Sequence, residues 1–232
     1  MTVIVLKDSF MVIIEYIKRN VQVRKILIVV GLVTILCCCN LGRIDEVNRD
    51  YLNELRQYPK FLVSHFPSKI ETLPIINRTI TDTTSDCILY MLIEKIDDKA
   101  YHIRDSLNKI KLKSYTANDS NLVTIKTEGL LGWHPEKIVY YRSLSRGSQF
   151  YYPIPYFESI KQNSMVKDVF SCSTISGLAG DIVIYIVDSK SGKFWTGLRP
   201  NKYMPVGWKN GYSKGVSLSP KMGIIIYWFV VW

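Results

Sequence analysis

The chain has 232 residues, of which 47% are hydrophobic, and 30 Lys and Arg side chains outnumber 20 Asp and Glu for a formal net charge of +10. The length suits one domain with a sizeable core or two small ones, and we expect one. The densest basic cluster, Lys109, Lys111 and Lys113, alternates with apolar residues. That pattern predicts a solvated edge of a helix or strand rather than a binding patch, so we expect no nucleic-acid partner.

An apolar segment from Ile26 to Cys39 follows the basic residues Arg24 and Lys25. Its 14 residues would span roughly 21 Å as a helix, against a hydrocarbon core of about 30 Å. The segment is therefore short for a membrane span and typical of the hydrophobic region of a secretory signal sequence. The basic stretch before it is unusually long, and Met11 is an alternative start.

The end of this segment resembles the lipobox of bacterial lipoproteins, in which a Leu or similar residue stands three positions before a lipid-modified cysteine. Cys39 fits best, with Leu36 three positions before it and two small cysteine side chains between them. Cys38 fits next, because Leu36 then fills a position that the pattern reserves for a small residue. The resemblance implies that residues 1–38 are removed and that residues 39–232 form an extracytoplasmic domain attached to the cell envelope. The alternative is an uncleaved single-pass anchor that extends through Gly42.

Two further cysteines, Cys87 and Cys172, lie in the expected mature domain. An oxidising compartment would allow them to form a disulfide. Cys87 also begins an apolar run, in which a reduced and buried cysteine is the ordinary occupant. Both states are therefore expectations that the sequence leaves open.

The first half of the mature chain predicts two helices and two strands. Apolar residues at spacings of three and four predict a helix over residues 43–58, which Pro59 ends. Residues 61–86 predict an extended connection with room for one short strand. A strand over residues 86–96, a helix over residues 98–111 and a short strand over residues 120–126 follow.

The second half predicts hairpins. A β-branched strand over residues 181–188 is followed by a turn at 189–193 and a return strand that begins at 193–196. Residues 212–219 and 223–232 form a second hairpin, and the last strand is apolar on both faces, which is typical of a central strand. The fold class is therefore α+β: a mostly antiparallel sheet built largely from the C-terminal half, with two helices nearer the N-terminus.

No catalytic or metal-binding motif is visible, since His65, His102 and His134 lack metal-ligand spacing and no nucleophile elbow occurs. We therefore expect no cofactor, no metal and no assigned catalytic residue. An aromatic segment offers the best binding candidates, which are Trp133, Tyr151, Tyr152 and Tyr156. Their rings suit a glycan or protein ligand, whereas the competing interpretation is that these tyrosines pack the loop onto the domain.

Together these features predict a lipid-anchored cell-envelope protein whose domain binds a ligand or acts as a scaffold. The alternative is an exported hydrolase with a dispersed active site. A hydrolase should show a cleft where a histidine or paired carboxylates converge. A binding module should show an exposed aromatic platform around Tyr151, Tyr152 and Tyr156.

Overall fold

A computed structural model describes residues 25, 43–72, 74, 76–81, 87–97, 99–125, 152–157, 168–171, 173–201 and 204–232. The chain divides into two compact units, residues 1–50 and residues 51–232. In the first unit residues 43–50 are helical, and the Asn48 side-chain amide donates to the carbonyl of Ile44 at 3.1 Å. The apolar segment with Cys38 and Cys39 lies outside the described residues. Of the helices that are described, none has the length and apolar character needed to cross a membrane.

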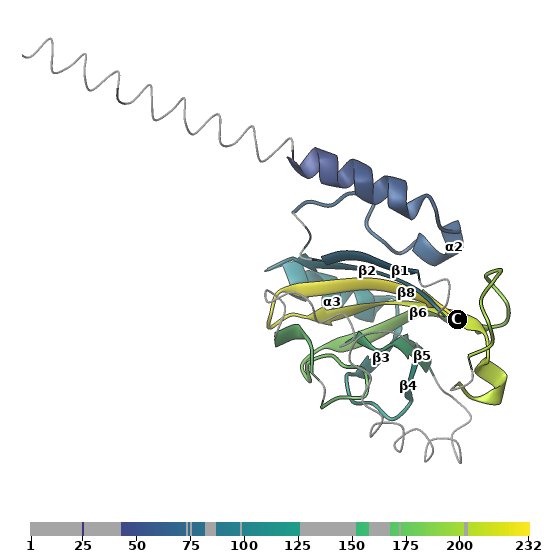
Figure 1. Ribbon diagram of the computed structural model, residues 1–232. Coiled ribbons are helices and arrows are strands. Elements are labelled where there is room, and N and C mark those ends of the chain that lie inside the picture. The colour runs from purple at the N-terminus through teal and green to yellow at the C-terminus, as the bar shows by residue number, and fades with distance from the viewer. Residues whose placement is uncertain are drawn as a thin grey trace, which may run out of the picture. The chain divides into compact units, whose positions relative to one another are not determined.

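The second unit is α+β, as the sequence predicts. Its sheet has six strands: β1 (Ile76–Thr81), β2 (Ile88–Lys95), β3 (Lys113–Thr116), β6 (Val183–Ser191), β7 (Gly211–Ser219) and β8 (Ile224–Val231). Their order is β1-β2-β8-β7-β6-β3, and every neighbouring pair is antiparallel (Figure 1). The expected central position of the last strand is confirmed, because β8 pairs with β2 on one side and β7 on the other.

The helices follow the predicted pattern with shorter bounds. Helical residues continue to 55, and Pro59 precedes the short helix α2 (Lys60–Val63). The next helix, α3 (Lys99–Lys109), follows β2. Ala100 on α3 is fully buried against the sheet, whereas Ile110, which the helical spacing included, lies beyond the helix and is 66% exposed.

The predicted strand at 120–126 is β4 (Leu122–Ile125), but its partner was not foreseen. It pairs in parallel with β5 (Tyr152–Pro155), forming a separate two-stranded sheet. Leu122 and Ile154 from this pair join the main core, which also contains Met91 of β2 and Trp228 of β8. The main sheet is thus covered on that face by β4 and β5, and by α3 on the other.

One predicted hairpin is wrong. The chain turns near Gly192, which has φ +135°, but residues 193–196 form no return strand. Instead β6 continues to Ser191 and pairs with β7, so the connection between them covers residues 192–210. The physical reason is tertiary: Phe194 packs edge-to-face on Tyr212 at 4.6 Å, and Trp195 lies 6.2 Å from Tyr58. These aromatic contacts hold the segment away from β6.

Small residues alternate along β7 and make room for Trp228 of β8 and for Trp232, which follows that strand. A Cβ placed on Gly215 would come within 2.4 Å of the Trp228 ring and of the Tyr185 carbonyl oxygen. The Trp228 indole N–H donates to the Ser217 hydroxyl at 3.1 Å, so the ring is oriented as well as accommodated. Close contact between these strands therefore depends on glycine at this position.

Candidate functional site

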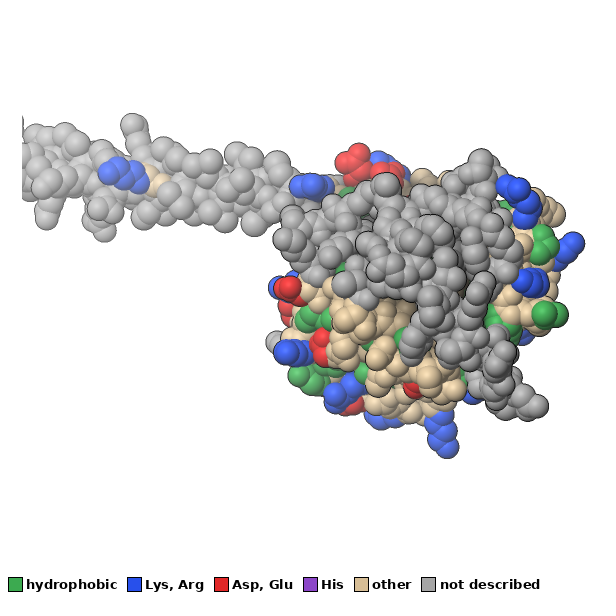
Figure 2. Space-filling view, turned by 60° about the horizontal axis from the view of Figure 1, so that its bottom comes forward, with side chains coloured by type: hydrophobic (Ala, Val, Ile, Leu, Met, Phe, Trp, Pro, Cys, Tyr) green, Lys and Arg blue, Asp and Glu red, His purple; other side chains and the backbone are tan. Residues whose placement is uncertain are grey.

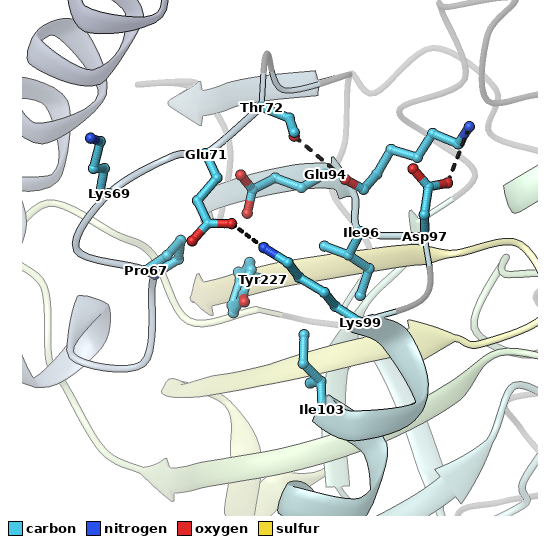
Figure 3. A pocket seen from close by; sticks show the side chains of 11 residues that line it. Pro67, Lys69, Glu71, Thr72, Glu94, Ile96, Asp97, Lys99, Ile103 and Tyr227 are labelled. Carbon is cyan, nitrogen blue, oxygen red and sulfur yellow. Dashed lines mark hydrogen bonds and ion pairs between the residues drawn. The ribbon is translucent and has the colours of Figure 1, made fainter.

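A half-open pocket of about 470 Å³ lies where the end of β2, the start of α3 and the segment 67–72 meet. This volume falls in the range of small-molecule sites. The side chains that line it are those of Pro67, Lys69, Glu71, Thr72, Glu94, Lys95, Ile96, Asp97, Lys99, Ile103 and Tyr227 (Figure 3).

The strand pleat places Glu94 in this pocket. Successive side chains of a strand point to opposite faces, so Glu94 shares the face of Tyr90 and Leu92, which are both fully buried. The pattern thus puts an acidic side chain at the end of a row of buried hydrophobic ones. Glu94 itself is only 7% exposed.

The corner between β2 and α3 fixes the pocket's rim. The backbone N–H groups of Ile96 and Asp97 both donate to the Gly223 carbonyl, at 2.7 and 3.2 Å. Gly223 has φ +62°, and a Cβ there would come within 2.8 Å of the Asp97 Cα. Glycine is therefore required for the turn after β7 to approach this corner.

Glu94 has an unusual charge environment. Burial, and then the negative charge of Glu71, raise the pKa of the Glu94 carboxyl group to about 7. No hydrogen-bond donor from the described part of the chain contacts its carboxylate. In Figure 3 this carboxylate points into the space that it shares with Glu71. Ionising an acid in a residue that is only 7% exposed is costly unless another group compensates its charge.

Glu71 differs from Glu94 in both exposure and pairing. The Lys99 ammonium group reaches across from α3 and forms an ion pair with the Glu71 carboxylate. A hydrogen bond and the positive charge of Lys99 lower the pKa of Glu71. The two glutamates of one pocket thus have pKa values shifted in opposite directions.

Two tyrosines support the inner side of the site. Burial, followed by the charge of Glu94, raises the pKa of Tyr227 to about 12. The Tyr51 hydroxyl donates to the Pro67 carbonyl at 2.6 Å, which fastens the start of the segment 67–72. Ile96 and Ile103 add partly buried apolar surface to the wall.

A second polar cluster fastens α2 to the sheet. The Lys214 ammonium group, 6% exposed in the residue as a whole, donates to the Phe61 carbonyl and to the Ser64 hydroxyl at 3.1 Å. His65 Nε2 donates to the Trp228 carbonyl at 3.0 Å, while no described residue contacts its buried Nδ1. Burial lowers the pKa of His65 to about 4. The contacts of His65 are therefore those of a packing residue.

The structure brings together few of the predicted binding residues. Tyr152 is partly exposed in β5, where its ring lies 4.9 Å from that of Tyr115 and Lys113 contacts its hydroxyl. Tyr156 is also partly buried, whereas Trp133 and Tyr151 lie outside the described residues. The aromatic platform therefore stays a prediction, and its described part is one pair of mutually tilted tyrosine rings beside a lysine.

The predicted cysteine pair also stays untested. Cys87 is 2% exposed and belongs to the main core, and Cys172 lies outside the described residues. Lys109, Lys111 and Lys113 are all exposed, as predicted for a solvated edge. In the described part of the chain no three His, Cys, Asp or Glu side chains gather to hold a metal ion.

Sequence reasoning missed Glu94 and Glu71. The available signal was an acidic residue on the buried face of an otherwise apolar strand, in the series Tyr90, Leu92 and Glu94. Glu71 carried no comparable signal, because it lies in a connection whose path depends on the Tyr51–Pro67 contact.

Comparison of the chain with protein-family models, with curated proteins and with solved structures finds no match.

Proposed function

We propose that this protein is a membrane-attached cell-envelope module that binds a small amine-bearing ligand in the pocket around Glu94. The observation that carries the proposal is the Glu94 carboxyl group, which lines the pocket beside Ile96 and Ile103, belongs to a residue that is only 7% exposed, and receives no hydrogen bond from the described part of the chain. An ammonium group would supply the missing charge partner, and a short alkyl chain would cover Ile96 and Ile103. The location rests on the lipobox-like sequence that ends at Cys39.

Binding should be coupled to release of the Glu94 proton. Because the pKa of this carboxyl group is about 7, an ammonium ligand must displace a proton at lower pH. The affinity for a probe such as n-butylamine should therefore rise about tenfold per pH unit below pH 7 and level off above it. Butanol, which has the same chain without the charge, should bind weakly and with no such pH dependence.

Calorimetric titration of n-butylamine into the full chain tests this proposal. Glu94→Gln should remove most of the affinity and all of its pH dependence, whereas Asp105→Asn, on the exposed face of α3, should change neither. Equal affinity of wild type and Glu94→Gln would refute the amine site.

A second candidate function is acid–base hydrolysis, which the opposite pKa shifts of Glu71 and Glu94 favour. Paired carboxyl groups with separated pKa values are the usual equipment of a general acid and a general base. Turnover of chromogenic glycosides or esters, abolished by Glu94→Gln and by Glu71→Gln alike, would support this alternative. Amine binding without turnover of any such substrate would leave the binding module as the better account.

A further inference from the structure

The sequence after Asp188 contains no acidic residue. Residues 189–232 include seven basic ones, Lys190, Lys193, Arg199, Lys202, Lys209, Lys214 and Lys221. All the Asp and Glu side chains of the protein thus precede this stretch, and its charge is uncompensated within its own sequence. Four of these basic residues belong to the connection 192–210 between β6 and β7.

Backbone and aromatic contacts hold this connection to the end of the sheet. Its two ends meet where the Gly192 N–H donates to the Asn210 carbonyl at 3.0 Å. Within it, Phe194 packs against Tyr212, and the Trp232 indole N–H donates to the Trp208 carbonyl at 2.7 Å. The connection is therefore a loop with fixed ends and its own aromatic packing, rather than a structureless linker.

Apolar side chains are exposed at the same place. Val206, in the short 3-10 helix η4 (Val206–Trp208), is 90% exposed. Phe61 of α2 is 41% exposed, and its ring lies 6.1 Å from that of Phe194. These two are among only four large hydrophobic side chains that are exposed in the described part of the chain.

Basic side chains belong to the same connection. Lys193 and Arg199 are exposed, and Lys209 follows η4 directly. Figure 2 shows hydrophobic and basic side chains interleaved along the right edge of the molecule, the edge at which Figure 1 draws the 192–210 connection, with no acidic side chain visible there. We call the surface formed by Phe61, Lys193, Arg199, Val206 and Lys209 the basic apolar edge.

We propose that the basic apolar edge binds the surface of a bilayer that contains anionic lipids. Lysine and arginine are attracted to anionic headgroups, and exposed apolar side chains gain free energy by entering the boundary between headgroups and acyl chains. Val206 would occupy that boundary while Lys193, Arg199 and Lys209 contact phosphate groups. A soluble polyanion would use the charges but would leave Val206 in water. This surface is separate from the amine pocket, so either proposal can fail without the other.

Hydrogen exchange of the full chain in lipid nanodiscs tests the proposal. Backbone amides of residues 193–201 and 206–210 should exchange more slowly in discs that contain phosphatidylglycerol than in discs of phosphatidylcholine alone. Each basic residue near an anionic surface contributes about 1 kcal/mol, so Lys193→Glu with Lys209→Glu should reduce this protection at least tenfold. The matched control, Lys109→Glu with Lys111→Glu, changes two exposed lysines elsewhere and should leave it intact.

Val206→Ser separates lipid from other anions. It should reduce quenching of tryptophan fluorescence by brominated lipids, while unchanged exchange in β7 and β8 shows that the variant is folded. Equal protection in neutral and anionic discs would overturn the proposal. Protection by soluble heparin that matches that of anionic discs, with no effect of Val206→Ser, would overturn it in favour of a soluble polyanion.

Discussion

Glu94 and His65 are buried titratable groups on one face of the sheet. Burial raises the pKa of Glu94 and lowers the pKa of His65. Glu94 is protonated in the folded protein up to about pH 7 but ionises near pH 4.5 when unfolded. The folded state therefore binds more protons between these values, and the free energy of unfolding falls as pH rises through that window.

The Glu94→Gln variant should remove this loss. We expect the Glu94 contribution to fall by about 2 kcal/mol between pH 4.5 and 7, a value that allows for solvent access through the open pocket. Urea denaturation at several pH values measures it, and Glu94→Gln should gain stability over wild type at pH 8 relative to pH 5. An unchanged difference between the two proteins across this range would contradict the assigned pKa.

His65 should act in the reverse direction. Its pKa is about 4 in the folded protein against 6.5 when unfolded, so the unfolded state takes up a proton first and stability is lost as pH falls through this range. The loss should approach about 3 kcal/mol at pH 4. His65→Gln, which keeps a donor for the Trp228 carbonyl, should lack this loss in the same denaturation experiments. If its stability fell as steeply as that of wild type in acid, another group would be responsible.

The orientation of Glu94 could be predicted from the sequence, whereas its proximity to Glu71 could not. The alternation along β2 predicts that Glu94 faces the same way as Tyr90 and Leu92. It does not reveal that Glu71, from a connection more than twenty positions earlier, lies beside it. That proximity depends on the Tyr51 hydroxyl bond to Pro67 and on the Lys99 ion pair, which are tertiary contacts.

At the scale of elements, the contact between β7 and β8 depends on glycine opposite a tryptophan. Gly215→Ala would force its Cβ against both the Trp228 ring and the Tyr185 carbonyl. Since the carbonyl belongs to the backbone of β6, the strands must shift, and we expect a loss of about 2 kcal/mol or more. Gly180→Ala is the matched control, because nothing lies within 4 Å of its added Cβ. Equal urea midpoints for the two variants would argue against the tight contact.

Elements whose signals lie close together in the sequence could be predicted, whereas those that depend on distant contacts could not. β8 and the hairpin with β7 are encoded locally, by the apolar run of β8 and by the turn residues Pro220 and Gly223 between the two strands. The prediction of a return strand after Gly192 was wrong because the Phe194 and Trp195 rings pack against Tyr212 and Tyr58, so residues 193–196 do not pair with β6. β4 was predicted as a strand, but its parallel partner β5 lies far along the chain, and single-strand patterns carry no information about such pairing.

For the whole molecule, the proposed attachment to the envelope leads to a direct prediction. Labelled fatty acid should enter the wild-type protein expressed in bacteria, and Cys39→Ala should abolish incorporation because the thiol that accepts the diacylglyceryl group is gone. Cys38→Ala should leave it largely intact. Incorporation that persists in Cys39→Ala but not in Cys38→Ala would move the site by one residue. Wild-type protein that stays unlabelled and keeps its N-terminus would indicate the single-pass anchor instead.

The strand order also determines when this fold can form. β2 lies between β1 and β8 in the sheet, and β8 is the later of these neighbours to be synthesised. Ile88 of β2 pairs with Val231 of β8, and Lys95 pairs with Ile224. Ribosomes add about 5–20 residues per second, so β2 waits roughly ten seconds for the strand that completes it. Throughout that interval its apolar run from Ile88 to Ile93 has only β1 to pair with, and its other edge is exposed and prone to aggregation. The order of the strands therefore makes this protein a late folder, because the centre of its sheet cannot assemble before residues 224–231 have been made.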